Sequence, residues 1–145
     1  MLQASTALRN YMLATGSFAA ALAGGFIKIY AGVPPATADS ALSGNTLLTT
    51  ITLNGDGVTG LTMATTAASG AISKPNAVWQ GTNAATGTAT FWRFVLTADT
   101  GAAITTEIRL QGNAATAGAE LVMTNIALTS GATQNIDYFA VALPA

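Results

Sequence analysis

The chain has 145 residues, almost half of which are Ala, Thr or Gly, and only 8% of which are charged. The length fits one domain, and six acidic against five basic residues give a formal net charge of −1. Because the chain has no His and no Cys, it has no Ser–His catalytic pair, no zinc–thiolate site and no disulfide. The five basic residues are scattered rather than gathered in a stripe, so we expect no nucleic-acid partner, and we expect no cofactor.

Residues 1–25 are predicted to form an N-terminal helical segment. Good helix formers fill residues 2–14, and Ser5 or Thr6 is placed to cap the start of this helix. Gly16 is a typical stop, and Ser17 then begins a shorter helix that ends before Gly24 and Gly25.

Residues 10–27 carry no charge, which raises the possibilities of a membrane span and of a signal peptide. Thr15-Gly16-Ser17 interrupts the apolar run, and much of the remainder is Ala. Ala21-Leu22-Ala23 resembles a small-x-small cleavage site, but Arg9 is the only early positive side chain. We therefore expect a retained structural element and no membrane partner.

From residue 26 onward, short alternating apolar and polar segments are separated by turn residues, which predicts β-strands. Asn54-Gly55-Asp56-Gly57 is a strong turn signal, and 32–44, with Pro34-Pro35, reads as an irregular loop. In chain order the predicted strands are 26–31, 47–53, 58–65, 78–80, 89–97, 104–111, 120–128 and 136–143.

This pattern predicts a mainly β fold, an antiparallel β-sandwich of the jelly-roll type with a short N-terminal helix. The helical segment 1–25 and the sandwich 26–145 are expected to form a single domain. Within 120–128 the alternation shifts by one residue, and a β-bulge near Thr124 and Asn125 would account for the shift.

Asp99 and Glu107 are the carboxylates that a hydrolase of this sequence would use, because a predicted hairpin brings them across from one another. Glu107 also lies two residues from Arg109 on the polar face of a predicted strand, where a solvated ion pair is the ordinary arrangement. We therefore expect no enzymatic activity and no small-molecule substrate.

Two predicted strands, 89–97 and 136–143, are apolar on both faces. In 89–97, Trp92 and Phe94 share one face, while Phe91 and Val95 lie on the other around Arg93. Such a strand is covered on both faces. We expect the outer face to be covered by the N-terminal helix or by another subunit. A third possibility is that the face stays open as a carbohydrate platform on Trp79 or Trp92. The predicted interface residues are Leu8, Tyr11, Met12, Phe18, Phe91, Arg93, Val95 and Phe139.

Two segments carry a family resemblance. Residues 22–48 read Leu-Ala-Gly-Gly-Phe-Ile-Lys-Ile-Tyr-Ala-Gly-Val-Pro-Pro-Ala-Thr-Ala-Asp-Ser-Ala-Leu-Ser-Gly-Asn-Thr-Leu-Leu, and residues 87–94 read Gly-Thr-Ala-Thr-Phe-Trp-Arg-Phe. Together they resemble a group of small virion proteins of tailed bacteriophages, over about residues 5–97. The resemblance implies a capsid cement (decoration) protein or another virion component.

We therefore expect a virion structural protein on the capsid exterior, which bridges neighbouring subunits of the major capsid protein or other virion proteins. A dimer or trimer is expected, in which segment 1–25 or loop 32–44 grips the shell or a sister subunit. The alternative is a tail or fibre-associated adhesion module that binds a receptor.

Overall fold

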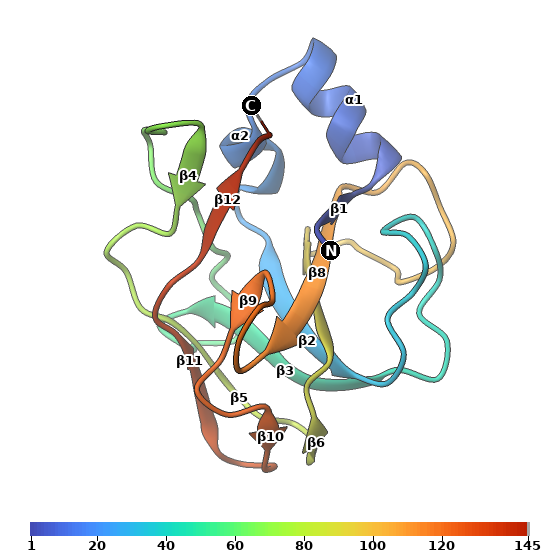
Figure 1. Cartoon of the computed structure of the whole chain (residues 1–145), viewed down its shortest axis with the longest axis vertical. Helices are drawn as coiled ribbons and strands as arrows, with labels where there is room; N and C mark the ends of the chain where they lie inside the picture. Colours follow the sequence, from blue (N-terminus) through green and yellow to red (C-terminus); the bar gives the residue numbers. More distant parts are fainter. Residues whose placement is uncertain (145) are drawn as a thin grey trace.

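The computed structural model describes residues 1–144 and is mainly β, with two short helices near the N-terminus (Figure 1). The helices are α1 (Thr6–Ala14) and α2 (Phe18–Leu22). The strands are β1 (Gln3–Ala4), β2 (Phe26–Ala31), β3 (Thr46–Leu53), β4 (Ala71–Ser73), β5 (Trp79–Thr82), β6 (Gly87–Thr88), β7 (Phe91–Val95), β8 (Arg109–Ala115), β9 (Leu121–Val122), β10 (Ala127–Leu128), β11 (Thr133–Ile136) and β12 (Ala140–Ala142).

Eight strands form one sheet in the order β1-β8-β7-β2-β3-β5-β11, with β9 pairing to β8. All neighbours are antiparallel except β8 and β9, which are parallel. Two antiparallel ribbons, β6–β10 and β4–β12, stand apart from this sheet. The expectation of antiparallel sheets with a short N-terminal helix is thus confirmed.

The core lies between the sheet and the segments that face it. Trp92 and Phe94 of β7 contribute from the sheet, while Leu128 of β10, Val141 of β12 and the intervening Phe139 contribute from the other side. The rings of Phe139 and Trp92 meet edge to face, with centroids 5.1 Å apart. Aromatic pairs of this geometry add about 0.5–1.5 kcal/mol to the free energy of burial.

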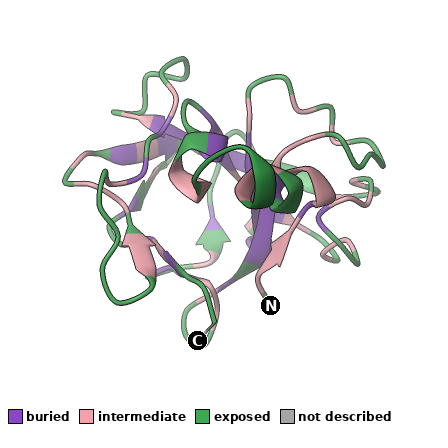
Figure 2. Ribbon diagram, turned by 90° about the horizontal axis from the view of Figure 1, so that it is seen from above, coloured by how far each residue is buried: buried purple, intermediate pink, exposed green. Residues whose placement is uncertain are grey.

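Both helices lie at one end of the β structure (Figure 1), and seen from that end they lie over the strands (Figure 2). Ser5 caps α1 by accepting a hydrogen bond from the Leu8 amide, and Ser17 caps α2 in the same way. Leu8 and Leu22 are both fully buried in the common core. The helices are therefore packed into the domain rather than extended from it.

Several predicted strands were wrong in part. The segment 58–65 is not a regular strand, because Asp56 accepts hydrogen bonds from the Val58 and Thr59 amides and bends the chain. Likewise 104–108 is irregular, and β8 begins only at Arg109.

The predicted bulge in 120–128 is instead a break between β9 and β10. There the Asn125 side chain accepts from the Ala127 amide, which holds a local turn. The strands β4, β6 and β11 fall in stretches that we read as loops or strand ends.

Candidate functional site

The outer face of β7 is covered by the chain's own loop 32–44. Phe91, Arg93 and Val95 are completely buried. The Arg93 guanidinium donates to the Ser40 carbonyl at 2.8 Å, and the Gln111 amide donates to the Pro35 carbonyl at 2.8 Å. The cover expected from the N-terminal helix or a second subunit is thus supplied by this loop. Phe91, Arg93 and Val95 consequently have no surface to offer a partner.

Two arginines are buried on this covered face. Arg93 Nε donates to Gln111 Oε1 at 2.8 Å, and its Nη1 has no hydrogen-bond partner within residues 1–144. Burial lowers the pKa of Arg93, and the nearby Arg109 charge lowers it further. Burial also raises the pKa of Tyr30, which stacks on Phe91, to about 12.

Arg109 holds both carboxylates that a hydrolase would need. Its Nε contacts Asp99 and its Nη2 contacts Glu107, and the Arg109 side chain is fully buried. Its Nη1 also donates to the carbonyls of Ala38 and Ala102, which ties loop 32–44 to the loop before β8. The predicted ion pair between Glu107 and Arg109 is present, but it is not fully solvated, because the Arg109 side chain is buried. This cluster fastens two loops to the sheet.

The remaining predicted interface residues divide into two groups. Leu8 and Phe139 are buried in the core, at 0% and 2% exposure. Tyr11, Met12 and Phe18 are half-buried and pack against the core from the helices. Only these last three keep a side-chain surface available to a partner.

Apolar side chains on the two helices and at the chain ends stay wholly or partly open to solvent, and we call this set the helical end: Leu2, Met12, Leu13, Phe18 and Leu143. Leu13 on α1 is 85% exposed and Leu143 is 65% exposed. A hollow of about 250 Å³ lies here, with Leu2, Met12, Phe18 and Leu143 in its lining. Apolar surface of this kind is typical of sites that bind other proteins.

Tryptophan provides no carbohydrate platform in this fold. Trp79 is 1% exposed and Trp92 is 0% exposed, so neither ring offers a face to a sugar. Trp92 Nε1 instead donates to the Asn113 carbonyl at 3.1 Å. The possibility of a carbohydrate platform on Trp79 or Trp92 was therefore wrong.

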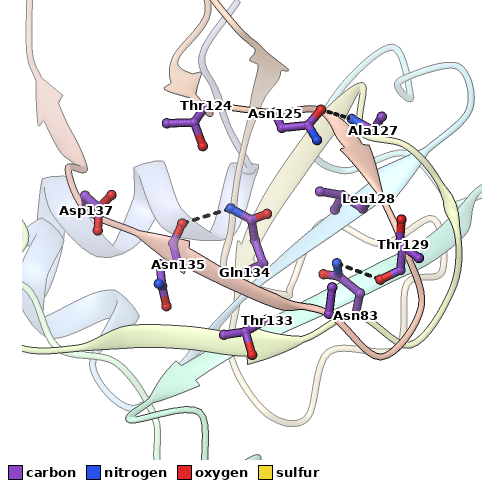
Figure 3. A pocket seen from close by; sticks show the side chains of 11 residues that line it. Asn83, Thr124, Asn125, Ala127, Leu128, Thr129, Thr133, Gln134, Asn135 and Asp137 are labelled. Atoms are coloured by element: carbon purple, nitrogen blue, oxygen red, sulfur yellow. Dashed lines mark hydrogen bonds between the residues drawn. The ribbon is translucent and has the colours of Figure 1, made fainter.

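A polar groove, which sequence reasoning missed, lies between β11 and the segment that carries β10 (Figure 3). We call it the amide groove; its volume is about 330 Å³. Its lining residues are Asn83, Thr124, Asn125, Ala127, Leu128, Thr129, Ala132, Thr133, Gln134, Asn135 and Asp137. Because β6 and β10 lie at the end of the fold opposite the helices, the groove is remote from the helical end (Figure 1).

Hydrogen bonds fix the groove's amide side chains. Asn83 Nδ2 donates to the Thr129 carbonyl at 3.1 Å, and Gln134 Nε2 donates to the Asn135 carbonyl at 2.9 Å, as the dashed lines of Figure 3 show. Asn83 is 3% exposed, and its Oδ1 has no partner within residues 1–144. A second hollow of about 530 Å³ adjoins the groove through Thr124, Asn135 and Asp137.

No protein-family model, curated protein or solved structure matches the chain. Among residues 1–144, no helix is both long and apolar enough to cross a membrane.

Proposed function

We propose that this chain is a capsid cement (decoration) protein of a tailed bacteriophage, a virion structural protein with no enzymatic role. It sits on the capsid exterior and bridges neighbouring subunits of the major capsid protein. The resemblance of residues 22–48 and 87–94 to small phage virion proteins supports this proposal, and the two segments lie side by side in the fold. Residues 22–48 supply β2, loop 32–44 and the start of β3, and β2 pairs with β7 of the second segment.

The helical end carries the proposal. A side chain as exposed as Leu13 gains about 1.5–3 kcal/mol when a partner buries it completely. Each contact is weak alone, but a copy that touches two shell subunits, or a dimer or trimer of this chain, gains by avidity. Loop 32–44 was the other expected gripping element. Its bonds to Arg93 and Gln111 hold it on the sheet, which favours the helical end.

We further propose that the fold is a sandwich of the jelly-roll type. The curled sheet would be one layer, and the ribbons β6–β10 and β4–β12 would be the second. Core side chains converge from both, with Trp92 from the sheet and Leu128 and Val141 from the ribbons. That convergence is what two packed layers require.

The test is binding to purified capsid shells that lack this chain, measured by co-sedimentation. Leu13→Lys and Leu143→Lys place a charge on the helical end and are expected to weaken shell binding at least about tenfold. Val33→Lys is the matched comparison, because Val33 is 84% exposed but lies at the start of loop 32–44. Unchanged binding by the two helical-end variants, or loss of binding only in Val33→Lys, would contradict the proposal.

The amide groove favours a second candidate, a tail or fibre-associated adhesion module. Hydrogen-bonding side chains in a surface groove suit recognition of a polar receptor. This candidate predicts a few copies per particle, whereas a cement protein is distributed over the whole shell.

A further inference from the structure

The amide groove is lined by hydrogen-bonding side chains whose chemistry suits a ligand rich in hydroxyl groups. Its side chains supply amide donors and acceptors from Asn83, Asn125 and Gln134 and hydroxyls from Thr124 and Thr129. Figure 3 shows Gln134 extending from β11 into the space between the groove's two sides. Amides and hydroxyls both donate and accept, which is what a sugar hydroxyl needs from its partners. We infer that the groove is a binding site for a neutral saccharide.

Asn83 lies in the wall of the groove and carries a buried oxygen that is unpaired among the described residues. Its Nδ2 bonds to Thr129, which fixes the orientation of the amide, and its buried Oδ1 is left without a donor. Buried side-chain acceptors are nearly always paired, because a missing hydrogen bond costs stability. The oxygen has almost no accessible surface, so a ligand hydroxyl reaches it only when the Asn83 side chain shifts toward the groove.

Charge selects the class of saccharide. Among the described residues that line the groove none is Lys or Arg, and Asp137 is the one charged side chain. Anionic sugars are recognised through cations, and Asp137 would repel them. A neutral sugar, in contrast, can donate hydroxyl protons to the Asp137 carboxylate.

The adjoining hollow supplies the apolar contact that sugar binding also uses. Tyr138 and Val122 line this second hollow and are 76% and 59% exposed. An exposed tyrosine presents an apolar ring face with a polar tip, which suits the C–H face of a pyranose. The two volumes, about 330 and 530 Å³, lie within the range of small-ligand sites.

An extended peptide is the competing occupant, because β11 is the last strand of the sheet and its outer edge pairs with no strand of residues 1–144. Strand addition needs free backbone carbonyls along that edge. The Asn135 carbonyl already accepts from Gln134 Nε2. This contact occupies a carbonyl that an added strand would need, which favours a saccharide over an extended peptide.

The test is a titration of the ¹⁵N-labelled full chain, followed by amide chemical shifts. The probes are glucose, galactose, mannose and N-acetylglucosamine, with N-acetylneuraminic acid as the anionic comparison. We expect at least one neutral sugar to shift the amides of Asn83, Thr129 and Gln134 with a Kd in the millimolar range. N-acetylneuraminic acid is expected to shift them less.

The double variant Thr124→Ala/Gln134→Ala is expected to bind that sugar about tenfold more weakly, since it lacks two hydrogen-bonding groups. Asn10→Ala, an exposed asparagine on α1, is the matched control and should bind as the original chain does.

Three results would overturn the inference: no groove shift with any neutral sugar, full binding by the double variant, or stronger shifts with N-acetylneuraminic acid. Groove shifts that instead follow protein concentration without sugar would assign the groove to a second copy. The saccharide site does not depend on the cement proposal, because the amide groove and the helical end are formed by different residues. The double variant should therefore bind shells normally.

Discussion

Nε of Arg109 donates a hydrogen bond to Oδ1 of Asp99, and the two side chains are 0% and 3% exposed. The pair joins the first residue of β8 to the loop that follows β7. Glu107 contacts the same guanidinium from a more exposed position. Removing either charge of a buried pair leaves the other charge without compensation in a poorly solvated site.

Arg109→Leu is therefore expected to lower the free energy of unfolding by about 3–5 kcal/mol. Urea denaturation followed by circular dichroism measures this loss. Arg9→Leu is the control, because Arg9 is exposed on α1 and its guanidinium bonds to the nearby Thr6 hydroxyl, so its loss should be within about 0.5 kcal/mol. Equal, small losses in the two variants would show that the Asp99–Arg109 pair does not hold the loops.

Glu107 makes stability depend on acid pH. Burial raises the pKa of Glu107, but its side-chain interaction with Asp99 and the hydrogen bonds from Thr100 and Arg109 outweigh burial and lower the pKa from 4.5 to about 2. Between these values the unfolded chain binds a proton at Glu107 that the folded chain does not. This contribution to stability is therefore complete above about pH 4.5 and is lost as the pH falls toward 2.

Asp99 acts in the opposite direction, because burial raises its pKa and the folded chain takes up that proton first. Subtracting the stability of Glu107→Gln from that of the original chain at each pH gives the part that depends on Glu107, including its effect on Asp99. We expect this difference to shrink from pH 4.5 to pH 2. A constant difference over that interval would contradict the account of the cluster.

Local patterns in the sequence predicted the strands that carry the sheet's centre. Ile27 and Ile29 alternate with polar or outer residues in β2, and Ile51 does so in β3, so the core-facing side could be read directly. Ser5 and Ser17 were readable as caps for the same reason, since the capping bond spans only three residues. Contacts of short range leave a signal in sequence order.

Long-range contacts left no such signal. The cover over Arg93 comes from Ser40, which is 53 residues away, and a buried arginine is unusual enough that an exposed interface was the simpler expectation. The amide groove combines Asn83 with Thr129, 46 residues apart. Its one trace in the sequence is the group of amide side chains between Asn125 and Asn135, which is equally typical of turns.

Gly112 and Trp92 are cross-strand partners, and the indole lies over the glycine. A Cβ at Gly112 would come within 2.8 Å of Trp92 Cζ2, closer than packed atoms approach. Gly112→Ala is expected to cost about 1–3 kcal/mol and to shift the tryptophan fluorescence, because the ring must move. Fluorescence and urea midpoints identical to those of the original chain would mean that the ring is not seated on Gly112.

Two leucines on α1 separate the helix's structural role from its proposed binding role. Leu8 is fully buried, whereas Leu13 is 85% exposed. Leu8→Ala should lower the free energy of unfolding by about 2–5 kcal/mol, and Leu13→Ala should change it by less than about 0.5 kcal/mol. Thermal denaturation compares the two. A large loss of stability in Leu13→Ala would show that Leu13 is packed rather than exposed, and this would contradict the cement proposal.

The most direct test of the central claim is the copy number of this chain in purified phage particles. Quantitative mass spectrometry would measure it against the major capsid protein. A cement protein predicts a ratio near parity or a simple fraction of it, because each shell position offers an equivalent site for the helical end. A trace amount would support a tail or fibre component instead, and complete absence from particles would contradict a virion role.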